Sequence, residues 1–300
     1  MALRHFLALE DLSRAETEKL LARASELKRW RRAGKRPPLF ERKTLAMIFE
    51  KSSTRTRVSF EGAMAEGGGK AVFLSSHESQ LGRGEPVEDT ARVLSEMADA
   101  IMVRTFGHDI VERMARHARV PVINGLTNDL HPCQVLADLL TWFEHRGPIA
   151  GRRVAWVGDG NNMCNTYMSA ARLMDFELRV ATPPDYAPRA TVPDGARITL
   201  GHDPRLAVQD ADLVVTDVWA SMGQEEEAAA RREAFRAFQV DAALMARAAP
   251  DALFMHCLPA HRGEEVAAEV IDHPASVVWD EAGNRLHAQK ALLEFLLNQA

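Results

Sequence analysis

The chain of 300 residues has few cysteines and few features that would send it to a membrane or to a nucleic acid. It contains three cysteines, an odd and sparse set that argues against a disulfide framework and predicts a reducing compartment. The opening residues, Met1–Phe6, lack the pattern of a signal peptide, and no apolar run is long enough to span a bilayer. No basic cluster stands out and the net charge is −5, so we expect no nucleic-acid partner, no membrane partner and a cytoplasmic location.

What is present is the composition of a globular protein with an ample core. Hydrophobic residues make up 46% of the chain and charged residues 26%, and the length suits one large or two modest domains. Apolar runs typical of buried strands alternate with helical patterns, which predicts an α/β fold with mainly parallel sheets. The alternation stops at Gly147–Gly151 and restarts at Val154–Val157, so we expect a second unit to begin near residue 147.

Helix signals frame the chain at both ends. Ser13 and Glu16 form a predicted capping box ahead of a first helix that runs from Ala15 to about Trp30. Near the other end, Val277–Trp279 reads as a last strand and Arg285–Leu297 as a final helix with one apolar face.

The densest polar cluster is Ser52–Arg57, which holds serines, threonines and two arginines. It follows the apolar run Leu45–Phe49 and precedes the helical pattern Val58–Met64. A strand that turns into a helix presents free backbone N–H groups at the positive end of the helix dipole. Hydroxyls and guanidinium groups at that point add charge-assisted bonds to phosphate oxygens. The cluster therefore indicates a phosphate site, with a solvated polar helix start as the alternative.

Two further polar clusters follow predicted strands. His131 lies in a loop after the strand Val120–Ile123 and opens an amphipathic helical run, and His256 and Cys257 end the strand Ala252–Met255. Taken alone, each histidine fits a structural role. In open α/β sheets, however, ligands bind at the carboxyl ends of the strands, which is where all three clusters stand.

Four motifs, in this order, make the chain resemble the ornithine carbamoyltransferases, within the aspartate/ornithine carbamoyltransferase superfamily. The resemblance covers essentially the whole chain. The first two motifs are shared with aspartate carbamoyltransferases and indicate the superfamily, whereas the last two discriminate within it. The motifs are Ser53-Thr54-Arg55-Thr56-Arg57, His131-Pro132-Cys133-Gln134, Asp217-Val218-Trp219-Ala220-Ser221-Met222-Gly223 and His256-Cys257-Leu258-Pro259.

The resemblance implies a reaction and an architecture. The expected reaction moves the carbamoyl group of carbamoyl phosphate to the δ-amine of L-ornithine through a tetrahedral intermediate, giving L-citrulline and phosphate in arginine metabolism. Residues 1–146 with 287–300 would form a carbamoyl phosphate-binding domain, and residues 147–286 an ornithine-binding domain, with the C-terminal helix packing back on the first. A homotrimer or a multiple of trimers is implied, with no cofactor and no metal.

The resemblance also implies roles for individual residues. Thr56, Arg104 and His131 would stabilise the developing oxyanion, and Cys257 would orient the δ-amine and help accept its proton. Gln80 would reach the site of a neighbouring chain. Ornithine would contact Asn162, Asp217, Ser221 and Met222. Carbamoyl phosphate would contact Ser53, Thr54, Arg55, Thr56, Gln80, Arg104, His131, Gln134, Cys257, Leu258 and Arg285.

Two alternative interpretations concern single motifs. Gly158–Asn162 follows a strand and resembles a dinucleotide fingerprint, but Met163 occupies the place of the third glycine, so we favour amino-acid binding. A covalent role for Cys257 would need a base within reach, and His256 is expected on the opposite face of the strand.

Cys133 and Cys164 are predicted to be packing residues. For the whole chain, the rivals are a sister transferase acting on putrescine or aspartate, and a two-domain binding protein or inactive regulatory homologue. Ser221-Met222-Gly223 and Cys257 argue against the sister transferases, and the retained catalytic positions argue against the inactive homologue.

Overall fold

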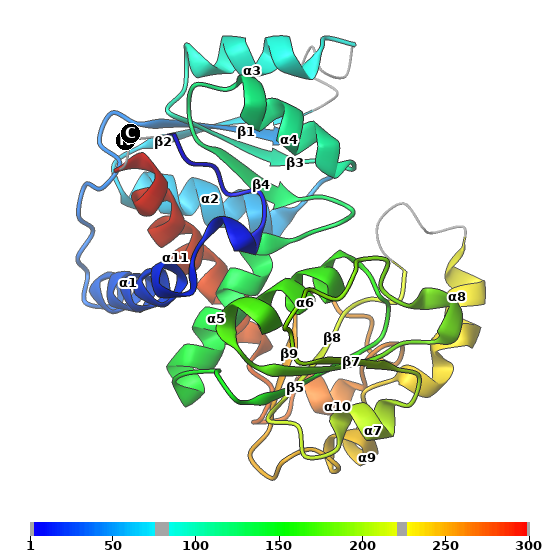
Figure 1. The fold of residues 1–300 in the computed structure, drawn as a ribbon. Coiled ribbons are helices and arrows are strands. Elements are labelled where there is room, and N and C mark those ends of the chain that lie inside the picture. The colour runs from blue at the N-terminus through cyan, green and yellow to red at the C-terminus, as the bar shows by residue number, and fades with distance from the viewer. Residues whose placement is uncertain (1–2, 76–83, 221–226, 299–300) are drawn as a thin grey trace. The chain divides into compact units, whose positions relative to one another are not determined.

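Two compact units, each built on its own parallel sheet, make up the computed structural model of the chain (Figure 1). The structure describes residues 3–75, 84–220 and 227–298. Unit 1 comprises Met1–Leu140 with Gly283–Ala300, and unit 2 comprises Thr141–Ala282. The α/β fold with parallel sheets that the alternating pattern predicted is confirmed.

The sheet of unit 1 has four strands in the order β2-β1-β3-β4, all parallel. The segment around Phe6 adds a parallel bridge beside β4, where its N–H donates to the Val122 carbonyl at 2.8 Å. The strands are β1 (Thr44–Phe49), β2 (Lys70–Ser75), β3 (Ala100–Arg104) and β4 (Val122–Leu126).

Helices cover both faces of this sheet (Figure 1). On one face, apolar residues of α3 and α4 pack on alternate strand residues such as Ile48 and Ile101. On the other face lies α2, which α11 approaches so closely at Gly62 that an added Cβ would stand 2.9 Å from Leu286. The helices are α1 (Arg14–Arg32), α2 (Thr54–Glu66), α3 (Val87–Ser95), α4 (His108–His117), α5 (Pro132–Arg146) and α11 (Val278–Leu297), preceded by a short turn η1 (Leu9–Asp11).

The sheet of unit 2 has five parallel strands in the order β7-β6-β5-β8-β9. The strands are β5 (Arg153–Val157), β6 (Glu177–Ala181), β7 (Ile198–Gly201), β8 (Leu213–Thr216) and β9 (Leu253–His256). The helices are α6 (Asn162–Met174), α7 (Pro204–Val208), α8 (Ala228–Phe235), α9 (Ala242–Met245) and α10 (Ala268–Ile271), with the short turns η3 (Pro184–Tyr186) and η5 (Arg236–Phe238).

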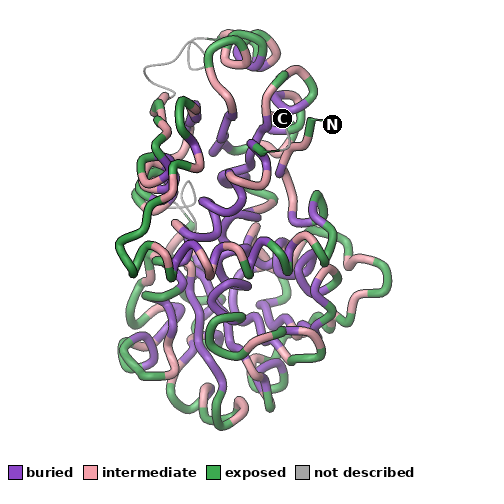
Figure 2. Tube along the Cα trace, turned by 90° about the vertical axis from the view of Figure 1, so that its left-hand side faces the viewer, coloured by how far each residue is buried: buried purple, intermediate pink, exposed green. Residues whose placement is uncertain are grey.

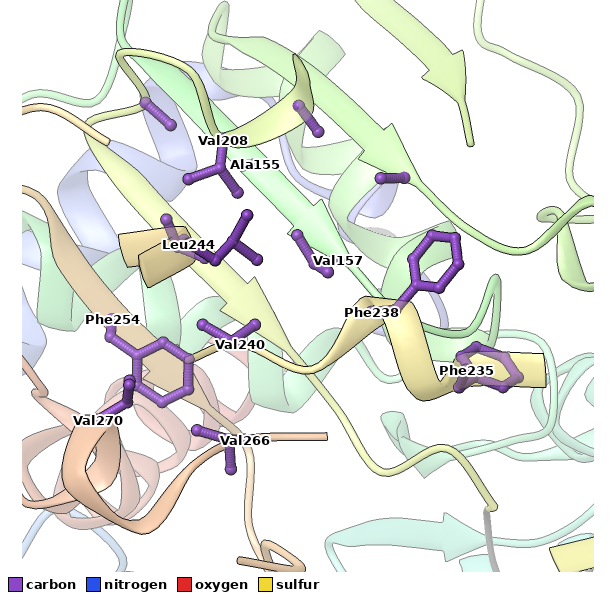
Figure 3. Packing of buried hydrophobic residues seen from close by; sticks show 14 of the residues in the cluster. Ala155, Val157, Val208, Phe235, Phe238, Val240, Leu244, Phe254, Val266 and Val270 are labelled. Atoms are coloured by element: carbon purple, nitrogen blue, oxygen red, sulfur yellow. The ribbon is translucent and has the colours of Figure 1, made fainter. Parts of the chain in front are cut away.

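An apolar cluster on one face of this second sheet holds the unit together (Figure 3). Val157 on β5 and Phe254 on β9 face the helical residues Phe235, Val208 and Val270, all of them buried. Figure 2 shows the same pattern along the chain, with buried segments inside each unit and exposed segments at its outer turns. Among the described residues, none of the helices combines the length and the apolar character that crossing a membrane requires.

Both sheets have a point where the chain reverses its direction of travel across the sheet. In unit 1 the chain runs from β1 outward to β2 and then returns to β3 on the other side of β1. In unit 2 it runs from β5 outward to β6 and β7 and then returns to β8 on the other side of β5. At such a point the loops that leave two neighbouring strands run in opposite directions. A ligand-binding crevice forms between these loops, at the carboxyl ends of the strands.

Several local predictions can be compared with the structure. The capping box is confirmed, since Ser13 and Glu16 each bond the other's backbone N–H at the start of α1. The C-terminal helix packs within unit 1, where Arg23 on α1 pairs with Glu294 at 2.7 Å. The predicted strand Val277–Trp279 is wrong, because the Val277 N–H donates to the Phe254 carbonyl at 3.0 Å in a single bridge and α11 begins at Val278.

The limits of the two units fall inside helices. Unit 1 ends at Leu140 within α5 and resumes at Gly283 within α11, while the sequence had placed these limits at residues 146 and 287. Gly147, interpreted as the start of a hinge, ends α5: it adopts φ 76° and its N–H donates to the Phe143 carbonyl at 3.0 Å. A glycine in this left-handed conformation is a common way to end a helix.

Candidate active site

The first polar cluster lies where β1 turns into α2. Ser53 caps the helix in an extended conformation, and its Oγ accepts from the Thr56 N–H at 3.2 Å and donates to the Thr56 hydroxyl at 3.1 Å. The cap engages one N–H group of the first helical turn, a turn whose first N–H groups have no carbonyl partner within the helix. Thr54 is exposed and Arg55 is half-buried beside them. The predicted turn from a strand into a helix is therefore present at this cluster, and its role in binding phosphate stays a prediction.

A chain of buried hydrogen bonds brings three predicted residues of unit 1 together. Arg285 donates from Nη2 to the Thr56 hydroxyl at 3.2 Å and from Nη1 to the Gln134 Oε1 at 2.5 Å. Gln134 in turn donates from Nε2 to Asp138 Oδ1 at 2.9 Å. Because Asp138 takes the Nε2 end, the amide presents its oxygen toward Arg285. Thr56, Gln134 and Arg285 come from three separate helices, so only the fold unites them.

Arg104 lies on the neighbouring strand at the same edge of the sheet. It pairs with Phe49 in the β1–β3 register and donates from Nε to the Lys51 carbonyl at 3.2 Å. Its side chain is almost fully buried. The Arg104 guanidinium is thus fixed at the reversal point between β1 and β3, next to the helix start that Ser53 caps.

His131 stands in a strongly cationic environment. It is buried, and its carbonyl accepts from the Val135 N–H at 3.3 Å at the start of α5. Burial, together with the charges of Arg285, Arg104 and Arg55, lowers the pKa of His131 well below its ordinary value of 6.5. The imidazole is therefore neutral near pH 7, and the charges of three guanidinium groups favour this neutral form.

Two basic residues near this site behave differently from each other. Arg57 is exposed and turns outward, where it pairs with Glu61 at 2.9 Å and lies 3.9 Å from the centre of the Phe73 ring. Lys51 is half-buried and donates to Asn128 Oδ1 at 2.6 Å. Burial and the charge of Arg104 lower the pKa of Lys51. Sequence reasoning did not single out Lys51, although it directly precedes the polar cluster.

In unit 2, Asp217 is the centre of a second cluster. It follows β8 and is buried. Its Oδ2 accepts from Asn161 Nδ2 at 2.8 Å, and its Oδ1 accepts from the Val218 N–H at 2.8 Å and from the Cys257 thiol at 3.0 Å. The carboxylate therefore joins the turn after β5, its own turn after β8 and the end of β9.

Asn161 makes a contact to Asp217 that the sequence did not predict. Its Oδ1 caps α6 by accepting from the N–H groups of Met163 and Cys164 at 3.0 and 3.2 Å, which leaves Nδ2 to donate to Asp217. Asn162 is the first residue of α6 and is half-buried. The signal for Asn161 was available, since asparagine directly before a helical run is a common N-cap.

The glycines before Asn161 allow close packing of the backbone against a neighbouring segment, and this role differs from that of the glycines in a dinucleotide-binding turn. Gly158 adopts φ 137°, which side chains rarely allow. At Gly160 an added Cβ would stand 2.2 Å from the Pro188 nitrogen, and the Gly160 N–H donates to the Tyr186 carbonyl at 2.9 Å. The backbone of this neighbouring segment occupies the face of the turn that a pyrophosphate would need.

Asp159 was missed as a candidate and is the second carboxyl group of this cluster. It pairs with Arg231 of α8 at 2.9 Å, and both side chains are buried. Burial raises the pKa of Asp159 to about 6, with the Asp217 charge adding to burial and Arg231 opposing it. A carboxyl group with such a pKa changes its charge in a range where enzymes work.

His256 and Cys257, at the end of β9, bond different groups, although their ligand atoms lie within 4.8 Å of each other. His256 is fully buried, its Nδ1 accepts from the Leu258 N–H at 2.9 Å, and its Nε2 lies 3.0 Å from Glu265 Oε1. Nε2 therefore carries the hydrogen that bonds Glu265. Cys257 is half-buried and bonds Asp217, whereas both ring nitrogens of His256 are already engaged by Leu258 and Glu265.

Ligand atoms of Asp217, His256 and Cys257 lie within 4.8 Å of one another, as do those of His261, Glu264 and Glu265. Both nitrogens of His256 are engaged by protein groups, which leaves the first group short of a tetrahedral set. In the second group, Glu265 already bonds His256.

The other two cysteines, Cys133 and Cys164, have the environment of packing residues. Burial raises the pKa of Cys133 to about 12, and burial with the Asp159 charge raises the pKa of Cys164 well above its ordinary value of 9.0. Both are fully buried. Gln80, Ser221 and Met222, which were also predicted to contact the substrates, lie outside the described residues.

Comparison with known proteins gives matches over nearly the whole chain. Residues 4–144 match the family described as aspartate/ornithine carbamoyltransferase, carbamoyl-P binding domain, and residues 150–296 match its Asp/Orn binding domain. The chain is 65% identical over 298 residues to an ornithine carbamoyltransferase of Methylococcus capsulatus, covering 98% of each protein.

Solved structures give the same result. The fold matches an ornithine carbamoyltransferase of Pyrococcus furiosus with a TM-score of 0.95 at 52% identity, covering 100% of this chain and 98% of that one. It also matches the enzyme of that name from Burkholderia thailandensis, with a TM-score of 0.91 at 55% identity over 98% and 99% of the two chains.

Proposed function

The chain belongs to the aspartate/ornithine carbamoyltransferase family, and on that premise we propose that it transfers the carbamoyl group of carbamoyl phosphate to the δ-amine of L-ornithine. The products are L-citrulline and phosphate. The observation that carries the proposal is the buried hydrogen-bonded chain of Thr56, Arg285 and Gln134 at the start of α2. It places a hydroxyl, a guanidinium and an amide within one site, which suits a ligand with both a phosphate and a planar amide.

Unit 1 would bind carbamoyl phosphate. The α2 start holds the phosphate through N–H groups and hydroxyls, and the guanidinium of Arg55 adds a charge-assisted bond. Arg104 is positioned to bridge the phosphate and the carbonyl oxygen, and Gln134 would accept a second hydrogen bond, from the carbamoyl NH₂, through the Oε1 that already accepts from Arg285. The proposed set in unit 1 is Ser53, Thr54, Arg55, Thr56, Arg104, His131, Gln134 and Arg285.

Neutral His131 suits the carbonyl oxygen of this ligand. As the δ-amine attacks, the carbonyl oxygen gains negative charge, and donors aimed at it lower the barrier. A neutral imidazole donates a hydrogen bond without becoming a competing proton source, and its lowered pKa keeps it neutral near pH 7. Arg104 and the Thr56 hydroxyl complete the proposed oxyanion-stabilising set.

Unit 2 would bind L-ornithine. The Asp217 carboxylate is suited to the α-ammonium group, and Asn162, at the start of α6, to the α-carboxylate. Ser221 and Met222 remain proposed contacts for the same end of the substrate. Cys257, already bonded to Asp217 at 3.0 Å, would face the δ-amine, and Leu258 would contact the carbamoyl group.

The chemical step needs the amine in its neutral form. An ordinary lysine-like amine with a pKa of about 10.4 is neutral only about once in two to three thousand molecules at pH 7. The linked Cys257–Asp217 pair would accept the amine proton as the N–C bond forms. The tetrahedral intermediate then breaks its C–O bond, and phosphate leaves toward the α2 start.

Replacement Cys257→Ser should lower turnover but leave measurable activity, and a carbamoyl-enzyme adduct in intact-mass spectra would contradict this route.

The proposal extends to domains, assembly and location. Carbamoyl phosphate and ornithine would be divided between units 1 and 2, and the chain would form a homotrimer or a multiple of trimers. A cytoplasmic location would suit the three free cysteines, because reducing compartments keep thiols unpaired. Sedimentation of the purified protein tests the trimer.

Citrulline formation with a panel of acceptors tests the activity itself. The purified chain is supplied with carbamoyl phosphate and either ornithine, putrescine, lysine, acetylornithine or aspartate. We expect rapid phosphate release and citrulline only with ornithine. Preference for putrescine or aspartate would identify a sister transferase, and no phosphate release with any acceptor would identify an inactive homologue.

A further inference from the structure

A buried ion pair in unit 2 joins the turns that leave two neighbouring strands. Asp159 lies in the turn after β5, and Arg231 belongs to α8. Arg231 donates from Nη1 to Asp159 Oδ2 at 2.9 Å and to the Trp219 carbonyl, in the turn after β8, at 2.8 Å. The two side chains expose only 8% and 10% of their surface. A single nitrogen therefore holds both turns from within the protein.

Each of these turns also carries one side of the Asp217 cluster. Asn161 lies two residues after Asp159 and donates to Asp217 Oδ2 at 2.8 Å. Trp219 lies two residues after Asp217 itself. A displacement of either turn would therefore move the Asp217 carboxylate relative to Asn161, and the pair of Asp159 with Arg231 opposes such a displacement.

Arg231 is held on two other sides. Its Nε donates to Glu227 Oε2 at 3.1 Å, one helical turn earlier, and its guanidinium lies 4.8 Å from the centre of the Tyr186 ring. These contacts orient the guanidinium independently of Asp159. The ionisation of Asp159 thus decides how firmly an already oriented arginine binds the turn after β5.

We propose that Asp159 is a positioning residue for the amino-acid substrate, acting through Arg231 to hold the Asp217 turn where it receives the substrate's α-ammonium group. The inference rests on the proposed function of unit 2. Asp159 takes no part in the chemical step. Its charge sets the affinity for the amino acid, and loss of that charge weakens binding in unit 2 while leaving the unit 1 site intact.

The pH dependence of this device follows from the groups that face Asp159. They are Arg231 with Glu227 behind it on α8, Asp217 after β8, and Cys164 on α6. Burial raises the pKa of Asp159 to about 6, so the carboxyl group takes up a proton between pH 7 and pH 5. The bond to Arg231 then loses its ionised acceptor, and such bonds are about half as strong when neutral.

Acid changes the stability of the fold through Asp159 in the opposite direction to its effect on substrate binding. Because the pKa of Asp159 in the folded chain lies above its ordinary value of 3.8, protonation favours the folded state over the unfolded one. This group's stabilising contribution is complete below pH 3.8 and is lost as the pH rises through about 6. Acid should therefore weaken substrate binding through Asp159 without weakening the fold through it, which separates positioning from a purely structural role.

The test uses the binding of L-norvaline in the presence of carbamoyl phosphate, measured by calorimetry from pH 7 to pH 5. Norvaline keeps the α-ammonium and α-carboxylate of ornithine and lacks the δ-amine, so its own charge does not change in this range. For the unaltered chain we expect the Kd to rise roughly fivefold toward pH 5, as one charge-assisted bond weakens by about 1 kcal/mol. The Asp159→Asn variant should show the raised Kd at pH 7 and little change on acidification.

Asp175→Asn is the matched control, because Asp175 pairs with Arg197 at 3.0 Å on the surface of the same unit. It should bind norvaline like the unaltered chain at every pH. If Asp159→Asn does not fold, Arg231→Lys is used in its place, since lysine keeps the charge but lacks the planar fork. This variant should also have a higher Kd than the unaltered chain at pH 7, and its Kd should change little down to pH 5.

A Kd of the unaltered chain that stays constant from pH 7 to pH 5 would overturn the inference. So would an Asp159→Asn or Arg231→Lys variant that retains the full pH dependence. If the unaltered chain binds no norvaline at pH 7 and forms no citrulline, the proposed function fails instead, which keeps the two failures distinct.

Discussion

The polar clusters of the two units occupy the same place in their sheets and carry opposite charge. In unit 1 the cluster lies between β1 and β3, and Arg55, Arg104 and Arg285 surround a neutral His131. In unit 2 the cluster lies between β5 and β8, and it is centred on the carboxyl groups of Asp217 and Asp159, with Arg231 as the buried counter-ion of Asp159.

The difference teaches that topology places a site and side chains decide its ligand. A reversal in strand order opens a crevice at the carboxyl edge of either sheet. Arginines at that edge suit a phosphate, whereas Asp217 suits an ammonium group. Each unit therefore supplies charges opposite to those of one proposed substrate: positive for the phosphate and negative for the ammonium group. This division can be tested residue by residue.

Replacing Arg104 should have the largest effect. Arg104→Ala removes a buried charge from the proposed oxyanion and phosphate contacts, and we expect kcat to fall by roughly 10²–10³-fold, as for the loss of an oxyanion donor. Steady-state kinetics measure it. Arg57→Ala is the matched control from the same neighbourhood, since Arg57 pairs with Glu61 on the surface, and it should stay within about threefold of the unaltered chain. Equal losses in both variants would show that Arg104 has no special place in unit 1.

Asp217→Asn should affect the use of ornithine, in binding and in the proposed proton transfer, and not the binding of carbamoyl phosphate. The replacement keeps the shape of the side chain and removes its charge, so the KM for ornithine should rise by roughly 10- to 100-fold, the value of one charge-assisted bond to an ammonium group. The KM for carbamoyl phosphate should stay nearly constant. A rise in the KM for carbamoyl phosphate with no change for ornithine would break the proposed division between the units.

The burial of His131 in unit 1 predicts a loss of stability in acid. Its folded-state pKa lies well below 6.5, so the unfolded chain binds this proton more readily. The stabilising contribution is present above pH 6.5 and falls as the pH drops toward the folded-state pKa, by at most about 1.4 kcal/mol per pH unit. Urea unfolding at pH 7 and pH 5 measures the free energy of unfolding. Between these two pH values it should fall less for the His131→Gln variant than for the unaltered chain. Equal losses would mean that His131 is not held neutral.

The smallest expected effect concerns the thiols. Iodoacetamide reacts with thiolates, so Cys133 and Cys164, buried and with raised pKa values, should resist modification at pH 8, while half-buried Cys257 should react. Peptide mass mapping identifies the modified residue. Cys133→Ala should change kcat by less than about twofold, because a packing residue contributes volume rather than chemistry. Early labelling of Cys133 would contradict its packing role.

Local patterns predicted much of the fold. Ser13 was identifiable as a helix cap because a cap bonds residues two or three positions away. The same reasoning failed at Val277–Trp279, where β-branched residues favoured a strand. Packing of a 20-residue helix overrode that preference, since β propensity depends strongly on neighbours outside the segment. Strand β7 was not predicted, and its pattern of half-buried and exposed residues explains why no apolar run marked it.

The candidate site was predicted less evenly. Arg104, His131 and Asp217 follow apolar runs, so their positions at strand ends could be inferred from their neighbours. Asn161 was not predicted, although its position before the helix marked it as the cap. Asp159 could not be recognised, because its partner Arg231 lies 72 residues away and only the fold buries the two together.

By itself, the sequence determined where strands turn into helices and which polar side chains stand at those turns, because these preferences act over a few residues. Only the tertiary structure decided which turns meet. The strand orders, the bond between Thr56 and Arg285 across 229 residues, and the tie between Asp159 and the turn after β8 depend on how whole strands and helices pack. Their physical cause is burial: desolvation makes each buried charge bind a specific partner, and the fold alone supplies that partner.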